Sequence, residues 1–309
     1  MEIRRSKIIN RFPWLKQKNC KYIISSSYEG LICSSFLNHF LDWKLVGYYD
    51  LEKLWISEEA KKNKKNIIWV DLNILPIQGR AIGGHIVALD NEIPGGFKSS
   101  CNPNILVRLS SNDFKYKYPF STIMFLLWLH NKKILDSDES RFALLHADDT
   151  WLKYQKYNSN CKLWINTLND YNWGSIFDKA NNKSFEKKIS TKYYPYFQSK
   201  NFFNQKGKIK SQFYSIISKQ LWFNPDWDED IILNILSYFA KNLEWTPPVI
   251  PTISDRIDGL KSKMDLKEIK AEGISNFVKT NKVFSYAIPS KKTFSYTVFN
   301  KMNQNPIYE

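Results

Sequence analysis

The chain has little cysteine and no long apolar run. Its four cysteines, Cys20, Cys33, Cys101 and Cys161, form no CxxC pair, so the spacing of a zinc site or a small disulfide framework is absent. No segment approaches the ~18 unbroken apolar residues of a membrane span. The basic N-terminus lacks the apolar core of a secretory signal. We therefore expect a cytoplasmic protein with reduced thiols and no membrane association.

Arginine is scarce too, because only 7 of the 45 basic residues are Arg and 38 are Lys. Against 30 acidic residues this gives a net charge of +15, which favours a polyanionic partner such as a nucleic acid or a nucleotide. AT-rich codon usage would also raise Lys, together with Asn, Ile, Tyr and Phe. A surface that is merely coated with lysine is therefore the alternative interpretation.

The remaining composition is that of a globular protein, with 43% hydrophobic and 24% charged residues among 309. This length allows one large domain or two. We divide the chain into a domain over residues 1–165 and a region over 166–309. Prolines at 247, 248 and 251 indicate a linker near residues 246–254.

The first of these parts alternates predicted strands with predicted helices. Short apolar runs predict strands, and spaced apolar positions followed by polar ones predict helices. The strands are expected over 21–25, 45–49 and 66–70, and the helices over 30–43 and 120–130. Strands separated by helices favour an α/β domain with a mostly parallel sheet.

The second part reads as a basic, aromatic-rich α+β region. An amphipathic helix is expected over 228–245 and a Lys/Glu-rich helical stretch over 262–279. Two strands, expected over 282–287 and 292–299, share the sequence Phe-Ser-Tyr and are predicted to pair.

Acidic and imidazole side chains follow the predicted strands of the first part. The best set is Asp71, His85 and Asp149, with Glu29 as a fourth member. Because ligands bind beyond the carboxyl ends of parallel strands, these side chains are candidates for holding Mn²⁺ or Mg²⁺. Such an ion would activate a water and neutralise a phosphate. Each residue also has an ordinary alternative role, as a helix cap or a turn residue.

The order of these residues resembles the DHH phosphoesterase superfamily, which includes RecJ-type exonucleases. Residues 27–34, Ser-Tyr-Glu-Gly-Leu-Ile-Cys-Ser, resemble its first motif, and 67–71 resemble a strand that ends in Asp. Gly-Gly-His at 83–85 stands at the place of the Asp-His-His motif. Residues 144–150, Leu-Leu-His-Ala-Asp-Asp-Thr, resemble an Asp that follows an apolar strand. The resemblance covers residues 20–165.

The resemblance implies a metal-dependent phosphoesterase or nuclease. Asp71, His85 and Asp149 would hold the ion, and Glu29 would serve as ligand or base. The sequence departs from the family where Ser27 and Glu29 replace a pair of aspartates, and where glycine replaces two of the three Asp-His-His residues. These departures favour an alternative, a catalytically inactive module that binds nucleic acid or a protein partner within a complex.

A block of lysine and aromatic residues spans 181–220, with 9 Lys, 9 Phe or Tyr and 1 acidic residue. Cationic grooves lined by aromatic rings commonly hold single-stranded nucleic acid. We expect Arg80 of the first part, and Lys187, Lys188, Lys192 and Lys200 of this block, to contact phosphates. In the alternative interpretation, the rings face the core and the lysines face water. Trp222, Trp227 and Trp245 are expected to belong to the core or to a protein interface, and not to a cofactor site.

Overall fold

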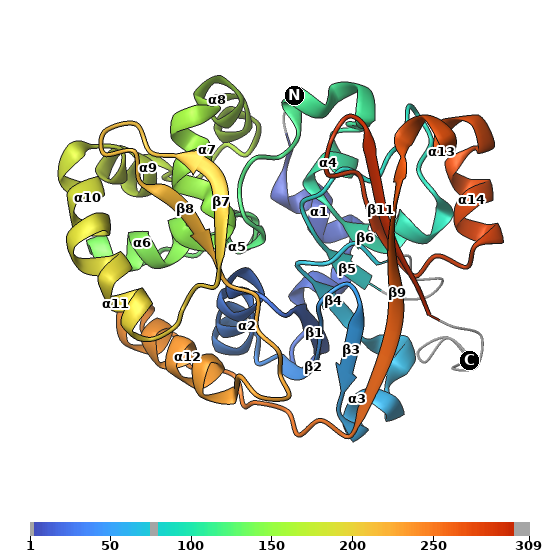
Figure 1. Ribbon diagram of the computed structural model, residues 1–309, viewed down its shortest axis with the longest axis horizontal. Helices are drawn as coiled ribbons and strands as arrows, with labels where there is room; N and C mark the ends of the chain where they lie inside the picture. The colour runs from blue at the N-terminus through green and yellow to red at the C-terminus, as the bar shows by residue number, and fades with distance from the viewer. Residues whose placement is uncertain (1–2, 75–79, 300–309) are drawn as a thin grey trace. The chain divides into compact units, whose positions relative to one another are not determined.

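The computed structural model describes residues 3–74 and 80–299 (Figure 1). Its described residues form two compact units, and the chain passes between them several times. The first unit lies within Met1–Arg5, Ser26–Phe40 and Pro119–Pro248, and the second lies within Ser6–Ser25, Leu41–Tyr118 and Val249–Glu309. This division differs from the predicted boundary at residue 165, which falls inside helix α8 (Asn158–Thr167). The last crossing, between Pro248 and Val249, falls within the segment 246–254.

The second unit is built on a nine-stranded sheet with the order β10-β11-β9-β3-β2-β1-β4-β5-β6. Figure 1 shows the long strand β9 in orange, between β3 and β11. The strands are β1 (Lys21–Ser25), β2 (Lys44–Tyr49), β3 (Lys53–Ile56), β4 (Ile68–Val70), β5 (Arg80–Ile82), β6 (Ser100–Cys101), β9 (Asp255–Asp265), β10 (Ser285–Ala287) and β11 (Thr293–Phe299).

The sheet is mixed, with a parallel part and an antiparallel part. Strands β2, β1, β4, β5 and β6 pair in parallel. Strands β3, β9, β11 and β10 continue the sheet beyond β2 in antiparallel pairing. The predicted α/β class is therefore confirmed, while the sheet as a whole is not mostly parallel. The predicted pairing of the two Phe-Ser-Tyr strands is confirmed, because Tyr286 lies opposite Tyr296.

Apolar side chains from both parts of this sheet share one core, which includes Ile23, Tyr49, Trp69, Ile257 and Phe284. Strands β1, β2 and β4 read as apolar runs because they are buried on both faces. The helices of this unit are α1 (Arg5–Arg11, apart from its first residue), α3 (Glu58–Lys62), α4 (Pro103–Leu106), α13 (Leu266–Glu272) and α14 (Ile274–Thr280), with short turns η1 (Pro13–Lys16), η2 (Lys64–Asn66), η3 (Gly95–Ser99) and η4 (Ser111–Tyr116).

The first unit is mainly helical. Its helices are α2 (Tyr28–Leu41, apart from its last residue), α5 (Thr122–His130), α6 (Asp138–His146), α7 (Thr150–Lys156), α8, α9 (Gly174–Ala180), α10 (Lys183–Lys188), α11 (Tyr194–Ser199) and α12 (Glu229–Leu243), with the turns η5 (Ala147–Asp149) and η6 (Ile189–Tyr193). Its one described sheet is a hairpin of β7 (Gln205–Lys210) and β8 (Ile217–Gln220).

Aromatic rings fill the core of the first unit. Phe142 stacks on Tyr193 with ring centroids 4.5 Å apart, and Phe197 lies 5.2 Å from Tyr238. Helix α12 adds one apolar face, on which Ile232, Ile235 and Phe239 are buried. This core therefore takes up many of the rings of the lysine and aromatic block.

The segment before Asp148 was predicted as a strand, and this prediction is wrong. Residues 138–146 form helix α6, which begins after the N-cap Ser137, whose side chain accepts a hydrogen bond from the backbone N–H of Ser140. Asp138 and Glu139 in the first turn complement the helix dipole. The apolar run Phe142–Leu145 fits a buried helix as well as a strand, and the cap decides between them.

Two absences apply to the described residues. None of their helices combines the length and apolar character needed to cross a membrane. All four cysteines are free, and three of them are buried.

Candidate functional site

The most unusual backbone of the first unit lies between helices α6 and α7. Asp148 and Asp149 are consecutive residues with φ of 48° and 51°. Such left-handed conformations are costly for residues other than glycine, although Asp tolerates them better than most. Asp149 is only 3% exposed. Strained backbone that carries a buried carboxyl is characteristic of functional positions, which makes this turn a candidate site.

The Asp149 carboxyl has an unbalanced environment. Its Oδ2 accepts a hydrogen bond from Gln220 Nε2 at 3.0 Å, whereas its buried Oδ1 has no hydrogen-bond partner among the described residues. Burial, together with the negative charge of Asp148, raises the pKa of Asp149 to about 6. Asp149 therefore gains or loses its proton close to neutral pH, as groups at functional sites often do.

One lysine, Lys153, lies among the acids around Asp149. Lys153 Nζ donates a hydrogen bond to Asp148 Oδ2 at 2.5 Å. Burial by itself would lower the pKa of Lys153, but Asp148 and the charges of Glu29 and Asp149 together raise it. Glu29 Oε1 accepts a hydrogen bond from the backbone N–H of Thr122, at the start of α5. We call Glu29, Asp148, Asp149, Lys153 and Gln220 the Asp149 cluster.

His146, at the end of α6, lies near this cluster in the chain but is held in an apolar environment. Its ring packs against Tyr28 at 4.8 Å and Phe197 at 5.2 Å, and neither ring nitrogen has a hydrogen-bond partner in the described part of the chain. Burial, with the charge of Lys219, lowers the pKa of His146 to about 3. The imidazole is therefore neutral at physiological pH and serves the core.

The β7–β8 hairpin packs against the Asp149 cluster. Gln220 belongs to β8, and Gly207 of β7 approaches so closely that an added Cβ would lie 1.7 Å from Ser218 Oγ and 3.2 Å from Asp149 Oδ2. Only glycine fits this approach. The hairpin thus has one face fixed on the cluster.

The other face of the hairpin carries a row of lysines. Exposure alternates along β7: Lys206, Lys208 and Lys210 are exposed, whereas Gly207 and Ile209 are half-buried. A bulge between Lys206 and Lys210 interrupts the pairing of β7 with β8. Lys206 lies opposite Lys219, and Lys210 lies opposite Ile217. Within the described part of the chain, no carboxylate pairs with these three lysines. We call them the hairpin lysine row.

The four residues of the predicted metal site are divided between the units. Glu29 and Asp149 belong to the first unit, and Asp71 and His85 to the second. Asp71 follows β4 and accepts a hydrogen bond from Ser25 Oγ at 2.5 Å. His85 is exposed on the segment after β5.

The structure gives no direct support to the predicted metal ion. Over residues 3–74 and 80–299, no group of three or more His, Cys, Asp or Glu side chains is arranged to hold one. In the Asp149 cluster, the ammonium group of Lys153 supplies the positive charge. The binding of Mn²⁺ or Mg²⁺ therefore stays a prediction from the sequence.

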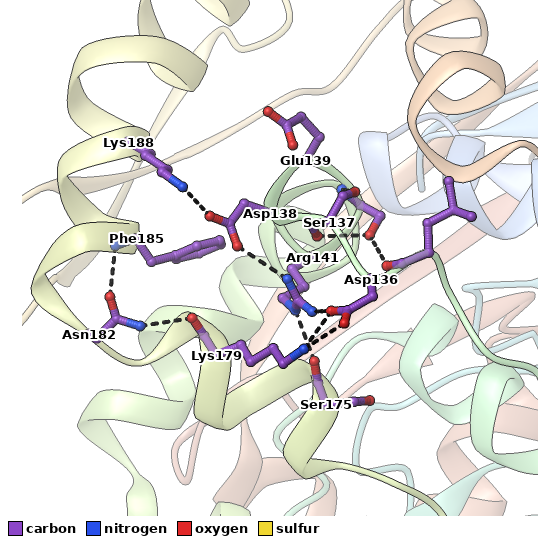
Figure 2. Close-up of polar contacts among 12 residues, drawn as sticks. Asp136, Ser137, Asp138, Glu139, Arg141, Ser175, Lys179, Asn182, Phe185 and Lys188 are labelled. Carbon is purple, nitrogen blue, oxygen red and sulfur yellow. Dashed lines mark hydrogen bonds and ion pairs between the residues drawn. The ribbon is translucent and has the colours of Figure 1, made fainter.

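Two of the four lysines predicted to bind nucleic acid are paired with carboxylates. Lys188 bonds Asp138 and Lys192 bonds Glu139, both at 2.5 Å (Figure 2 shows the first pair). Lys187 and Lys200 are exposed on the helical surface, and Arg80 of the second unit donates to Gln17 Oε1 at 3.2 Å.

The aromatic rings of the block 181–220 divide into buried and exposed ones. Tyr193, Tyr194, Phe197 and Phe202 are buried, and Tyr196 is 42% exposed. Most of the predicted stacking platform therefore belongs to the core.

The hairpin lysine row was not predicted from the sequence, although the sequence contains a signal for it. Lys206-Gly-Lys-Ile-Lys210 alternates lysine with glycine or an apolar residue, which is the period of a strand with one solvated face. Judging the whole block by its composition concealed this alternation.

Glu186 fixes the far end of the hairpin and provides a prediction. Its buried carboxylate accepts hydrogen bonds from Gln155 Nε2 at 2.8 Å and from the backbone N–H groups of Phe213 and Tyr214 at 3.2 and 3.0 Å. Glu186→Ala would leave these donors without an acceptor, so we expect a loss of about 3 kcal/mol in unfolding free energy. Urea denaturation measures this loss.

Glu229→Ala is the matched control, because Glu229 is exposed at the start of α12 in the same unit. Its effect should be much smaller. Similar losses in the two variants would show that the Glu186 contacts do not stabilise the protein.

Comparison with known proteins adds no relative from which a function could be transferred. No protein-family model matches the chain, and neither a curated protein nor a solved structure is detectably similar to it. The resemblance to the DHH phosphoesterases therefore stays a prediction from short motifs.

Proposed function

We propose that the protein binds single-stranded nucleic acid through the hairpin lysine row. The observation that carries the proposal is the exposure of Lys206, Lys208 and Lys210 without a carboxylate partner among the described residues. Lysines that are already paired must break an ion pair to bind a phosphate. These three have no such pair to break, and their binding releases counterions from the nucleic acid. The net charge of +15 adds a general attraction for polyanions.

The arrangement of the acids favours binding over catalysis. Lys153 pairs with Asp148 in the Asp149 cluster, and that cluster anchors the hairpin through the hydrogen bond between Gln220 and Asp149. We infer a catalytically inactive module in which acidic positions of a DHH-like ancestor serve structural roles. The part of the fold that would correspond to the DHH-like sheet is the parallel part, which consists of β1, β2, β4, β5 and β6.

Fluorescence anisotropy with a labelled single-stranded oligonucleotide tests the binding proposal. We expect saturable binding that weakens as salt is added, because released counterions drive it. An oligonucleotide that does not bind at low salt would contradict the proposal. Capture of a protein partner instead would favour the other form of the inactive module.

A metal-dependent phosphoesterase is the second candidate. The observation in its favour is Asp149, whose carboxyl can exchange a proton close to neutral pH. A phosphodiesterase assay with Mn²⁺ or Mg²⁺ on single-stranded DNA and RNA tests it. Turnover that disappears in the Asp71→Ala/Asp149→Ala double variant would support this candidate, and no turnover in the unmodified protein would exclude it.

A further inference from the structure

A cavity of about 550 Å³ lies in the first unit, away from the residues of the proposed nucleic-acid interface. Its walls come from the segments 131–136 and 170–175, and Arg141 of α6 contributes to its lining. Its volume is within the range of small-molecule sites. We call it the Arg141 pocket.

The walls of the Arg141 pocket are held by hydrogen bonds. Tyr171 Oη donates to the carbonyl oxygen of Lys132 at 2.7 Å, which ties the two wall segments together. Arg141 Nε donates to the carbonyl oxygen of Ser175 at 2.9 Å, and Ser140 Oγ donates to that of Leu135. A pocket whose walls are already ordered loses little conformational entropy when a ligand binds.

An ion-pair network gives the pocket a positive bias. Arg141, only 4% exposed, pairs with both Asp136 and Asp138, and each carboxylate binds a second cation, Lys179 or Lys188 (Figure 2). Three cations therefore share two carboxylates. The network as a whole carries one uncompensated positive charge, and two of its members, Arg141 and Asp136, line the cavity.

Further charges at the walls preserve this bias. The carboxylate of Asp170 is opposed by the nearby charge of Arg5. Lys133 is exposed on the wall, and no described carboxylate pairs with it. The pocket should therefore attract an anion.

The rest of the lining suits a flat ring. Ile134, Leu135 and the half-buried ring of Tyr171 provide apolar surface. Asn131 and Asn172 add amide groups that can bond polar atoms at the edge of a ring. We propose that the Arg141 pocket binds a small aromatic phosphate monoester, in which a flat ring carries the phosphate group. This inference does not rest on nucleic-acid binding by the hairpin.

Isothermal titration calorimetry on the full chain tests this inference with phenyl phosphate, adenosine monophosphate and inorganic phosphate. Because the ring leaves water on binding, phenyl phosphate should bind about tenfold more tightly than inorganic phosphate. If adenosine monophosphate binds more tightly than phenyl phosphate, the ligand is a nucleotide. If the two bind equally, the pocket recognises the aryl phosphate group alone. Phenyl phosphate that binds no better than inorganic phosphate would overturn the proposal.

Lys133→Ala should weaken phenyl phosphate binding about tenfold, because it removes a charge-assisted contact. Lys162→Ala removes an equally exposed lysine from α8, outside the pocket, and should leave the affinity unchanged. Equal affinities in the two variants would contradict the assignment to this pocket. Both positions are exposed, so neither change should unfold the protein.

Discussion

Replacing Lys206, Lys208 and Lys210 together by alanine is expected to lower the affinity for a single-stranded oligonucleotide about 100-fold at low salt. Each lysine is exposed, and no described carboxylate pairs with it. A charge-assisted contact contributes about 1 kcal/mol or more, so three contacts correspond to at least two orders of magnitude in affinity. Fluorescence anisotropy titrations of the variant and the unmodified protein measure the difference.

The matched control replaces Lys187, Lys188 and Lys192, which removes the same number of positive charges from α10 and its continuation. Lys188 and Lys192 already pair with Asp138 and Glu139, so this variant should lose much less affinity. Equal losses would mean that total charge governs binding. A larger loss in the control would assign the interface to the helical lysines that the sequence indicated.

Asp149→Asn is expected to raise the unfolding free energy more at pH 8 than at pH 4. The gain over the unmodified protein should be larger at pH 8 by about 2 kcal/mol. The folded protein holds the pKa of Asp149 at about 6, above the ordinary value of 3.8. Above pH 6 the buried carboxylate is charged, and its burial lowers the unfolding free energy. This loss diminishes as the pH falls to about 4, because the carboxyl is then protonated in the folded protein. Asn carries no such charge and tolerates the left-handed conformation of this position.

Urea denaturation at several pH values from 4 to 8 measures this difference. Asp178→Asn provides a comparison, because Asp178 is exposed in the same unit and solvent screens its charge. A stability difference between Asp149→Asn and the unmodified protein that stays constant over this range would show that burial does not shift the titration of Asp149.

Local sequence patterns were sufficient for many elements of the fold. The apolar run at 21–25 became β1, and the spaced apolar positions after it became α2. Helix α12 and the paired strands β10 and β11 also lie where their patterns predicted them. In each case the signal lies within about fifteen consecutive residues, which is the range over which periodicity is informative.

Pairing between distant segments could not be predicted in this way. Strand β9 inserts between β3 and β11, whereas the sequence predicted no strand there and its residues 262–265 were expected to be helical. Its exposure pattern, with few buried positions, gives a weak apolar signal. The division into interleaved units could not be predicted either, because each unit joins segments that lie far apart in the sequence.

The candidate site was predicted in part. Asp149 emerged from its position in the sequence, but its buried environment depends on Gln220, 71 residues away. The ion pairs of Lys188 and Lys192 likewise come from residues about fifty positions earlier. A lysine count cannot separate paired from unpaired ammonium groups, so it pointed to the whole block and not to the hairpin.

The most direct test of the account is the salt dependence of oligonucleotide binding by the unmodified protein. Three lysines that each neutralise one phosphate of a single strand should give a slope of about −2 for log K against log salt concentration. We expect this slope, and a clearly shallower slope in the variant without the hairpin lysine row. A slope near zero in the unmodified protein, or one that the variant retains in full, would contradict the account.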